Sequence, residues 1–349
     1  METHPNFKLN GTSFSDNALN EFANSLVKEG KPFEVPIGNF ILDWTNQSKM
    51  VTVSTSGSTG KPKQIQLQKK HMVNSALATG SFFNLSARDS VLLCLPCDFI
   101  AGKMMLVRAM VLGLQIDVVE PSSNPLKDTS NSYDFGAMIP LQVQNSIDKL
   151  YRIGKLIIGG APLEKKLENK LRSLKTATYE TYGMTETITH IAVRKLEVSN
   201  FETIPTVTVK TDERGCLVIN APKITDEEVI TNDVVELISD TEFKWLGRYD
   251  TIINSGGIKL IPEQIERKLT KIIDTRFFVA GLQDDTFGEK LVLVVEGDID
   301  MPNLLMQIDN VNDLSKYEKP KAILNIEHFI QSANGKVLRS ETLSAALKN

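Results

Sequence analysis

Cysteine is scarce in this sequence, and the charge is close to balanced. The 349 residues include three cysteines, an odd and small number, so no disulfide framework is predicted. The net charge of -4 at pH 7 gives no reason to expect nucleic acid or an anionic membrane as a partner. No apolar run approaches a membrane span, and residues 1–5 lack a basic segment followed by an apolar one. We therefore expect a cytoplasmic protein.

Two of the cysteines, Cys94 and Cys97, form a C-x-x-C pattern of the kind found in redox and zinc sites. No second Cys/His pair is placed to complete a zinc site. Residues 91–97 form an apolar run typical of a buried strand end, where cysteine behaves as a small hydrophobic residue. We therefore expect both thiols to be structural.

The remaining composition predicts a folded protein with more than one core. Hydrophobic residues make up 41% of the chain and charged residues 23%, as in ordinary soluble proteins, and the length predicts two or three domains. Helical spacing predicts helices over residues 14–28, 69–83, 101–112, 141–150 and 163–174. Apolar runs predict strands over residues 51–53, 65–67, 91–95, 116–119, 135–139 and 155–158, and a strand or the lead into one over residues 40–42.

Because these helices and strands alternate, we expect an α/β architecture with a largely parallel sheet. Residues 193–237 are richer in strand patterns and carry a hairpin signal at residues 212–215. This stretch is expected to form a β-rich subdomain.

A loop rich in glycine, hydroxyl and lysine side chains lies between the strands predicted at residues 51–53 and 65–67. Glycines let backbone N–H groups approach an anion, hydroxyls donate hydrogen bonds and lysines add charge, so the loop is suited to a polyphosphate. It is not a Walker A loop, because its glycines are too close together and Pro62 follows Lys61. The alternative is a flexible surface turn. The candidate nucleotide-binding residues are Thr55, Ser56, Gly57, Ser58, Thr59, Gly60, Lys61 and Lys63.

Two further loops follow predicted strands. Ligands of open α/β sheets bind beyond the carboxyl ends of strands, and a Gly-Gly pair there would let a flat ring pack on the backbone. The first loop, which is otherwise a plain strand-to-helix turn, is Gly159, Gly160, Ala161 and Pro162. The second lies within residues 178–187, for which a strand followed by an ordinary polar loop is the alternative, and it offers an aromatic face, a hydroxyl for a phosphate and a carboxylate for Mg²⁺. Its candidate residues are Tyr182, Gly183, Thr185 and Glu186.

These motifs, in this order, resemble those of the adenylate-forming superfamily, which includes acyl- and aryl-CoA ligases. The match comprises the phosphate loop at residues 55–63 and the aromatic-Gly-x-Thr-Glu motif at residues 182–186. Residues 231–233 resemble the family's Thr-Gly-Asp, with Asn232 in place of glycine. The resemblance implies that Asp233 holds the ribose hydroxyls; a solvated loop aspartate is the alternative.

The resemblance extends through the C-terminal part. Residues 247–266 look like the family's hinge, with Arg248 implied to contact ribose or phosphate and Asp250 implied as the pivot. Residues 334–339 match the family's C-terminal Gly-Lys motif, which implies Lys336 as a catalytic residue alongside Glu186 and Thr185. A solvated turn lysine is the alternative for Lys336.

The phosphate loop begins early, so we expect a short member of the superfamily with a truncated leading subdomain. Short members resemble o-succinylbenzoate–CoA ligases of menaquinone biosynthesis. In those enzymes an arginine meets one substrate carboxylate, and Arg108, in an otherwise apolar helix, is the matching candidate. His190 is expected to line the same pocket; structural roles remain the alternatives for both. Many members carry a gating histidine at the position of Phe99. The gating role of that histidine is therefore not expected in this chain.

The resemblance implies an ATP- and Mg²⁺-dependent ligase that uses CoA and a small carboxylic acid as substrates. It implies an N-terminal AMP-binding domain over residues 1–248 and a small, mobile α+β domain over residues 249–349. A ligase for another small acid, an enzyme that loads a carrier protein and an inactive nucleotide-binding module remain open. The oligomeric state is not predicted.

Overall fold

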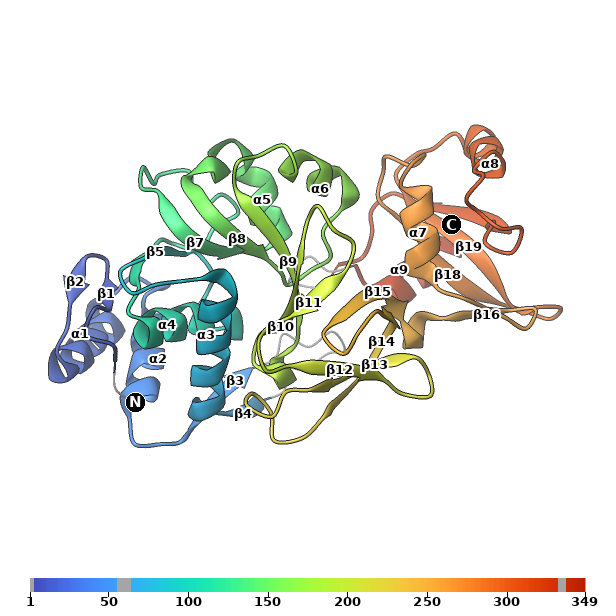
Figure 1. The fold of residues 1–349 in the computed structure, drawn as a ribbon. Coiled ribbons are helices and arrows are strands. Elements are labelled where there is room, and N and C mark those ends of the chain that lie inside the picture. The colour runs from blue at the N-terminus through green and yellow to red at the C-terminus, as the bar shows by residue number, and fades with distance from the viewer. Residues whose placement is uncertain (1–2, 55–63, 332–336, 349) are drawn as a thin grey trace. The chain divides into compact units, whose positions relative to one another are not determined.

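The computed structural model describes residues 3–54, 64–331 and 337–348. Contacts divide the chain into two compact units (Figure 1). The first unit comprises residues 1–209, 219–229 and 238–243, and the second comprises residues 210–218, 230–237 and 244–349. The predicted domain boundary at residues 248/249 stays a prediction.

The first unit is built on a mostly parallel sheet, as predicted. Strand order is β11-β10-β9-β8-β7-β5-β6-β1-β2, with parallel pairing from β9 to β1 and antiparallel pairing at both ends. The strands are β1 (Lys8–Leu9), β2 (Thr12–Ser13), β5 (Ser90–Leu93), β6 (Gln115–Val118), β7 (Tyr133–Met138), β8 (Ile153–Ile158), β9 (Ala177–Gly183), β10 (His190–Lys195) and β11 (Phe201–Thr203).

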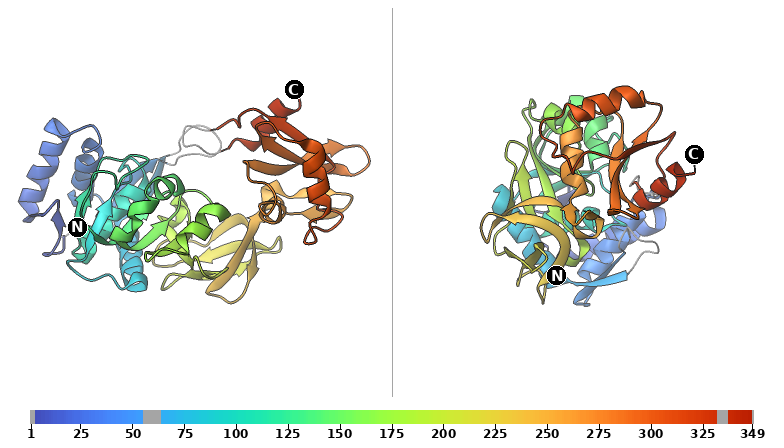
Figure 2. Two further views of the ribbon diagram at one scale, coloured as in Figure 1. Left: turned by 90° about the horizontal axis from the view of Figure 1, so that it is seen from above. Right: turned by 90° about the vertical axis from the view of Figure 1, so that its right-hand side faces the viewer.

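Helices pack around this sheet and carry much of the buried apolar surface. The α3–α4 pair is in contact, and so is the α1–α2 pair, whose members also lie side by side in Figure 2. The predictions at residues 69–83 and 101–112 are confirmed by α3 and α4, whereas the predicted helix at residues 141–150 is divided between α5 and a 3-10 helix. The helices are α1 (Asp16–Glu29), α2 (Val35–Thr45), α3 (Lys69–Phe83), α4 (Ile100–Leu112), α5 (Pro140–Asn145), η1 (Ile147–Arg152) and α6 (Lys165–Leu171).

The predicted strand at residues 40–42 is wrong, because these residues lie within α2. Ile37, Phe40, Ile41 and Trp44 are all buried and recur every three or four residues, which is the spacing of one helix face. A three-residue apolar run is too short to distinguish this period from that of a strand.

An antiparallel hairpin precedes α3. Its strands are β3 (Met50–Ser54) and β4 (Gln64–Gln68), paired from Met50–Gln68 to Ser54–Gln64. The strands predicted on either side of the phosphate loop are therefore confirmed. The loop itself, residues 55–63, lies outside the described residues.

The β-rich stretch contains four neighbouring strands in the order β12-β13-β14-β15. They are β12 (Thr208–Thr211), β13 (Cys216–Asn220), β14 (Val229–Leu237) and β15 (Glu242–Arg248). Gly215, with φ of +77°, ends the turn between β12 and β13, and the Asp212 N–H donates to the Cys216 carbonyl at 2.9 Å. The hairpin predicted at residues 212–215 is confirmed.

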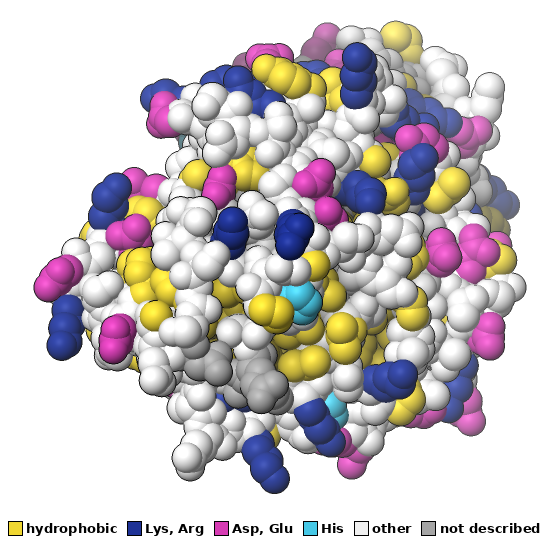
Figure 3. Space-filling view, turned by 60° about the vertical axis from the view of Figure 1, so that its left-hand side comes forward, with side chains coloured by type: hydrophobic (Ala, Val, Ile, Leu, Met, Phe, Trp, Pro, Cys, Tyr) yellow, Lys and Arg dark blue, Asp and Glu magenta, His cyan; other side chains and the backbone are white. Residues whose placement is uncertain are grey.

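The second unit contains a small α+β sheet, which confirms the predicted fold class. Its strands are β16 (Ile253–Ser255), β17 (Ile258–Leu260), β18 (Phe277–Asp284), β19 (Gly288–Glu296) and β20 (Ala322–Ile326). Its helices are α7 (Pro262–Leu269), α8 (Met301–Asp309) and α9 (Arg339–Ala346). Among the described residues no helix is long and apolar enough to cross a membrane. On the face shown in Figure 3, acidic and basic side chains are interspersed around hydrophobic ones.

Candidate functional site

The Thr185–Glu186 motif is presented by a tight turn after β9. Gly183 ends that strand, and a Cβ placed there would lie 2.3 Å from the Thr189 carbonyl oxygen, so the close approach requires glycine. Thr187 holds the turn, because its hydroxyl accepts from the Met184 N–H at 3.0 Å and donates to the Thr189 carbonyl at 2.9 Å. The turn leaves Glu186 exposed at the carboxyl end of a sheet strand.

The Gly159–Pro162 loop follows β8, the parallel neighbour of β9, so both motifs lie at the same edge of the sheet. Gly160 has φ of +86°, a conformation that favours glycine. A Cβ on Gly159 would lie 2.5 Å from the Thr181 hydroxyl, which itself donates to the Ile158 carbonyl at 3.0 Å. The loop backbone is therefore pressed against β9, while Gly160, Ala161 and Pro162 are exposed.

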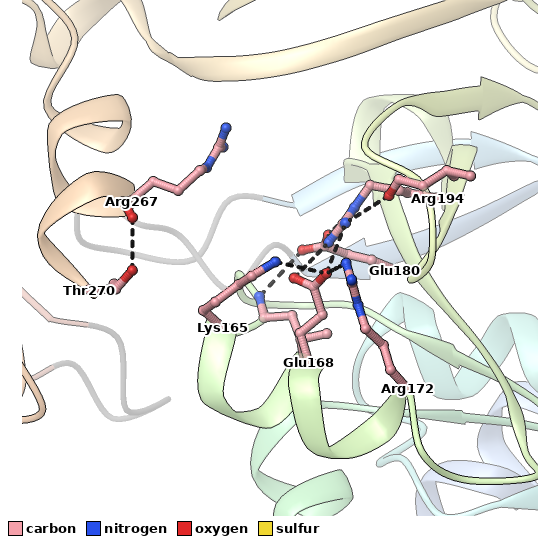
Figure 4. Close-up of polar contacts among 9 residues, drawn as sticks. Lys165, Glu168, Arg172, Glu180, Arg194, Arg267 and Thr270 are labelled. Atoms are coloured by element: carbon pink, nitrogen blue, oxygen red, sulfur yellow. Dashed lines mark hydrogen bonds and ion pairs between the residues drawn. The ribbon is translucent and has the colours of Figure 1, made fainter. Parts of the chain in front are cut away.

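An ion-pair network attaches this loop to the sheet (Figure 4). Glu180 accepts from the Leu163 N–H at 3.3 Å and pairs with Arg194 Nη2 at 2.6 Å. Arg194 Nη1 also lies 3.4 Å from Glu168 Oε1, which pairs with Arg172 at 2.5 Å. Burial by itself would raise the pKa of Glu168, but Arg194 and Arg172 hold that pKa below its usual value. Lys165 also pairs with Glu168 at 3.3 Å, so side chains of α6, of its C-cap Arg172 and of β9 and β10 together connect the end of the loop to two strands.

Tyr182 lies in an aromatic cluster within the first unit. Its ring meets Phe243 edge-on with centroids 5.3 Å apart, and Phe201 and Phe243 stack at 5.5 Å. Such packing holds an aromatic face in one orientation. The role of Tyr182 as an aromatic face of the nucleotide site stays a prediction.

Arg108 and His190 come together in the interior of the first unit. Arg108 is only 2% exposed, and its contacts are Met105 Sδ at 3.5 Å and the Thr189 hydroxyl at 3.4 Å. Its Nε atom is buried without a hydrogen-bond partner among the described residues. Burial lowers the pKa of Arg108 to about 10.

His190 is 4% exposed, and its Nε2 lies 3.2 Å from the Thr79 hydroxyl. Burial, and then the charge of Arg108, holds the pKa of His190 well below its usual value. The imidazole is therefore neutral at pH 7, and Arg108 is the cation of this pair. Thr79 was not among the residues predicted from sequence, because its helix gave no local signal of a contact with residue 190.

The second unit holds the predicted ribose-binding residues. Asp233, on β14, is 7% exposed, and its Oδ1 accepts from Trp245 Nε1 at 3.0 Å. Arg248 Nη1 lies 3.9 Å from the same oxygen, while Arg248 Nε and Nη2 bind Asp250 at 3.0 and 2.8 Å. Trp245 was also missed by sequence reasoning, because no local pattern relates it to Asp233 before the pairing of β14 and β15 is known.

Other predicted features are only partly visible. Lys336 and residues 55–63 lie outside the described residues. Among the described residues no three His, Cys, Asp or Glu side chains are grouped to hold a metal ion. Glu186 as a single exposed carboxylate nevertheless fits Mg²⁺, which takes one or two carboxylates and completes its shell with phosphates and water.

Cys94 and Cys97 are buried free thiols, and burial raises the pKa of each to about 12.

A large, mostly parallel sheet with strand-end loops and a small C-terminal α+β sheet form the architecture expected from the adenylate-forming resemblance. Residues 46–229 match the family described as AMP-binding enzyme. The chain belongs to this family, so the predicted superfamily resemblance is confirmed and the chain is of the AMP-forming acyl- or aryl-CoA ligase type.

Two groups of known proteins are similar to this chain. It is 25% identical to a 2-succinylbenzoate–CoA ligase of Bacillus cereus, over 86% of this chain and 70% of that protein. A Dyadobacter fermentans structure, an acyl-CoA synthetase (AMP-forming)/AMP-acid ligase II-like protein, is 32% identical and has a TM-score of 0.63. That match covers 94% of this chain and 98% of the other. The o-succinylbenzoate CoA synthetase of Bacillus subtilis, in complex with ATP and magnesium, has a TM-score of 0.73 at 19% identity. This match covers 84% of this chain and 69% of the Bacillus subtilis protein, and at this identity it shows a similar fold alone.

Proposed function

We propose that the protein adenylates 2-succinylbenzoate with ATP and transfers the acyl group to CoA. The family supports the ligase chemistry, and the relatives that are named 2-succinylbenzoate–CoA ligases support this acid. The single observation in the structure that favours a dicarboxylate is the environment of Arg108.

A buried guanidinium without an acidic partner is costly unless something compensates its charge. In the described part of the first unit the contacts of Arg108 are a thioether and a hydroxyl, and neither carries charge. A carboxylate of the substrate would supply the missing anion, and arginine suits bidentate carboxylate recognition. The acid would then need a second carboxylate to react with ATP, which is the case for 2-succinylbenzoate.

The reaction would proceed in two steps. A carboxylate oxygen attacks the α-phosphorus of ATP and pyrophosphate leaves; the CoA sulfur then attacks the acyl carbonyl carbon, loses its proton and displaces AMP. Glu186 would hold Mg²⁺, which supplies positive charge to the phosphates. In this proposal residues 55–63 hold the departing phosphates, Thr185 donates to a phosphate oxygen, and Lys336 stabilises the transferring group. Residues 159–162 and Tyr182 would hold the base. Asp233 and Arg248 would hold the ribose.

The proposal is tested by measuring pyrophosphate release from ATP and Mg²⁺ with a panel of carboxylic acids, each with and without CoA. Turnover that requires CoA and is strongest with 2-succinylbenzoate would support it. Turnover with simple benzoates or fatty acids instead would keep the ligase chemistry, reject this acid and return Arg108 to a structural role.

Transfer to a carrier protein and an inactive nucleotide-binding module are the other candidates. ATP–pyrophosphate exchange separates the inactive module from both enzymes, because exchange requires formation of the acyl-adenylate. Turnover with CoA as the acceptor separates the CoA ligase from a carrier-loading enzyme.

A further inference from the structure

The contact between Trp245 and Asp233 joins a residue without an assigned role to the carboxylate proposed to bind ribose. The two side chains come from the neighbouring strands β15 and β14 of the second unit. Trp245 Nε1 donates to Asp233 Oδ1 at 3.0 Å, well within the range of a good hydrogen bond. A hydrogen bond to a charged acceptor is among the stronger ones in proteins.

The backbone beside Asp233 is also held. The Asp233 N–H donates to the Thr231 hydroxyl at 3.0 Å, and that hydroxyl donates to the Leu217 carbonyl at 2.8 Å. Both the main chain and the carboxylate of Asp233 are therefore fixed by residues of this sheet. A binding group held in this way loses less conformational entropy when a ligand arrives.

Asn232, which replaces the family's glycine, does not compete for this face of the strand. Successive side chains of a strand point to opposite faces, so Asn232 and Asp233 diverge. Asn232 is exposed, and its Oδ1 accepts from Arg214 Nη1 at 2.9 Å. Arg214 Nη2 also donates to the Thr231 carbonyl at 3.0 Å, and its guanidinium lies 5.1 Å from the centroid of the Tyr249 ring. The replacement therefore adds contacts on the opposite face and leaves the Asp233 carboxylate in place.

We infer that Trp245 is a positioning residue for the nucleotide. Its indole N–H orients the Asp233 carboxylate so that this carboxylate accepts hydrogen bonds from the two ribose hydroxyls. An ionised carboxylate has about four lone-pair sites, so an indole donor on Oδ1 leaves acceptor capacity for a diol. Trp245 thereby acts on ATP through Asp233. The inference rests on the proposed function, because it takes an adenine ribonucleotide as the ligand.

The kinetic test is Trp245→Phe, which keeps an aromatic ring and removes the N–H donor. In ATP–pyrophosphate exchange the KM for ATP should rise about tenfold, which is the usual size of one lost hydrogen bond to a charged group. kcat should stay within about twofold, because the ribose is remote from the reacting phosphorus and contributes uniform binding. With ATP analogues that lack the 2′ or the 3′ hydroxyl, variant and wild type should differ less than they do with ATP.

Two comparisons separate positioning from a structural role. Trp44→Phe is the matched control, since Trp44 is the other tryptophan of the chain and is buried in α2. It should leave the KM for ATP unchanged. The double variant Trp245→Phe with Asp233→Asn should be no worse than Asp233→Asn alone, because both substitutions remove the same interaction.

A direct measurement on the wild-type protein uses the substitutions only to assign its signals. The two tryptophans should give two indole N–H signals in a ¹H–¹⁵N spectrum, assigned with the two Phe variants. Adding AMP should move the Trp245 signal and leave that of Trp44 in place. A Trp245 signal unmoved at saturating AMP, or an equal KM increase for ATP and its deoxy analogues, would overturn the inference while leaving the ligase proposal intact. Failure of the wild type to bind AMP or ATP would overturn both.

Discussion

The Arg108 guanidinium is buried in α4 without an acidic partner among the described residues. Substituting Arg108→Leu removes the charge that would pair with the second carboxylate of the acid. Loss of a buried partner of this kind costs at least about 2 kcal/mol, so the KM for 2-succinylbenzoate should rise about thirtyfold or more. The KM for a monocarboxylic acid should change far less. Equal effects on both acids, measured by pyrophosphate release, would remove Arg108 from substrate recognition.

Arg267→Leu is a suitable control for this variant. Arg267 is an exposed arginine on α7, so its loss should leave the preference between the two acids unchanged.

His190 should contribute to the pH dependence of stability. Burial holds its pKa in the folded chain well below 6.5, so below about pH 6.5 the unfolded chain binds a proton that the folded chain does not. Stability due to His190 is therefore complete above pH 6.5 and is lost as the pH falls, by at most about 1.4 kcal/mol per pH unit. His190→Gln should reduce this slope in denaturant titrations at several pH values.

The exposed His328 provides a matched control for the substitution itself, and His328→Gln should change the free energy of unfolding at pH 7 by no more than about 0.5 kcal/mol. His71 also has a lowered pKa, caused first by burial, so some slope should remain in the His190→Gln variant. If the free energy of unfolding of His190→Gln depends on pH as steeply as that of the wild type, the prediction is wrong.

At the scale of elements, the Glu168–Arg194–Glu180 network connects α6, β9 and β10 to the loop proposed to hold the base. Arg194→Met leaves two poorly exposed carboxylates with less compensation, and such losses cost about 3 kcal/mol. We expect a lower free energy of unfolding and a higher KM for ATP, since the Leu163 end of the loop depends on Glu180.

Arg194→Lys keeps the charge but not the fork of donors, so it should fall between wild type and Arg194→Met in both measurements. Urea denaturation and ATP–pyrophosphate exchange provide the two readouts. A variant destabilised as expected but with an unchanged KM for ATP would show that the network supports the fold without positioning the loop.

At the scale of the whole molecule, the proposed hinge lies in a short 3-10 helix, Tyr249–Thr251. Asp250 binds Arg248 through both carboxylate oxygens, and the Thr251 hydroxyl lies 3.1 Å from Glu263 Oε1 at the start of α7. Burial raises the pKa of Glu263. The family resemblance implies a rotation about Asp250. Each of these contacts would either break during that rotation or move together with the rotating part.

The two half-reactions give this proposal a direct test. Lys336→Ala should slow acyl-adenylate formation by about a hundredfold or more, because an electrostatic donor to a developing charge is worth about 3 kcal/mol. Thiolysis of a pre-made acyl-adenylate by CoA should be largely spared, since Lys336 would act only in the first step. Single-turnover measurement of each step provides the check, and equal losses in both would reject the assignment.

The sequence by itself determined those features whose physical cause is local. Helical spacing over 15 residues predicted α3, and the flanking alternation predicted the β3–β4 hairpin. The Tyr182–Glu186 motif indicated the family because its glycine and side-chain order carry the chemistry within a few residues. The three-residue run at residues 40–42 was misassigned because it was too short to show its period.

Only the tertiary structure decided which distant residues meet. Thr79 reaches His190 because α3 packs against the sheet, and Trp245 reaches Asp233 because β14 and β15 are neighbours. The same holds for the burial of Arg108 without an acid, since an arginine in an apolar helix can instead lie at a surface. Hydrogen bonds and desolvation between elements depend on packing, which has no counterpart in the spacing of residues along one segment.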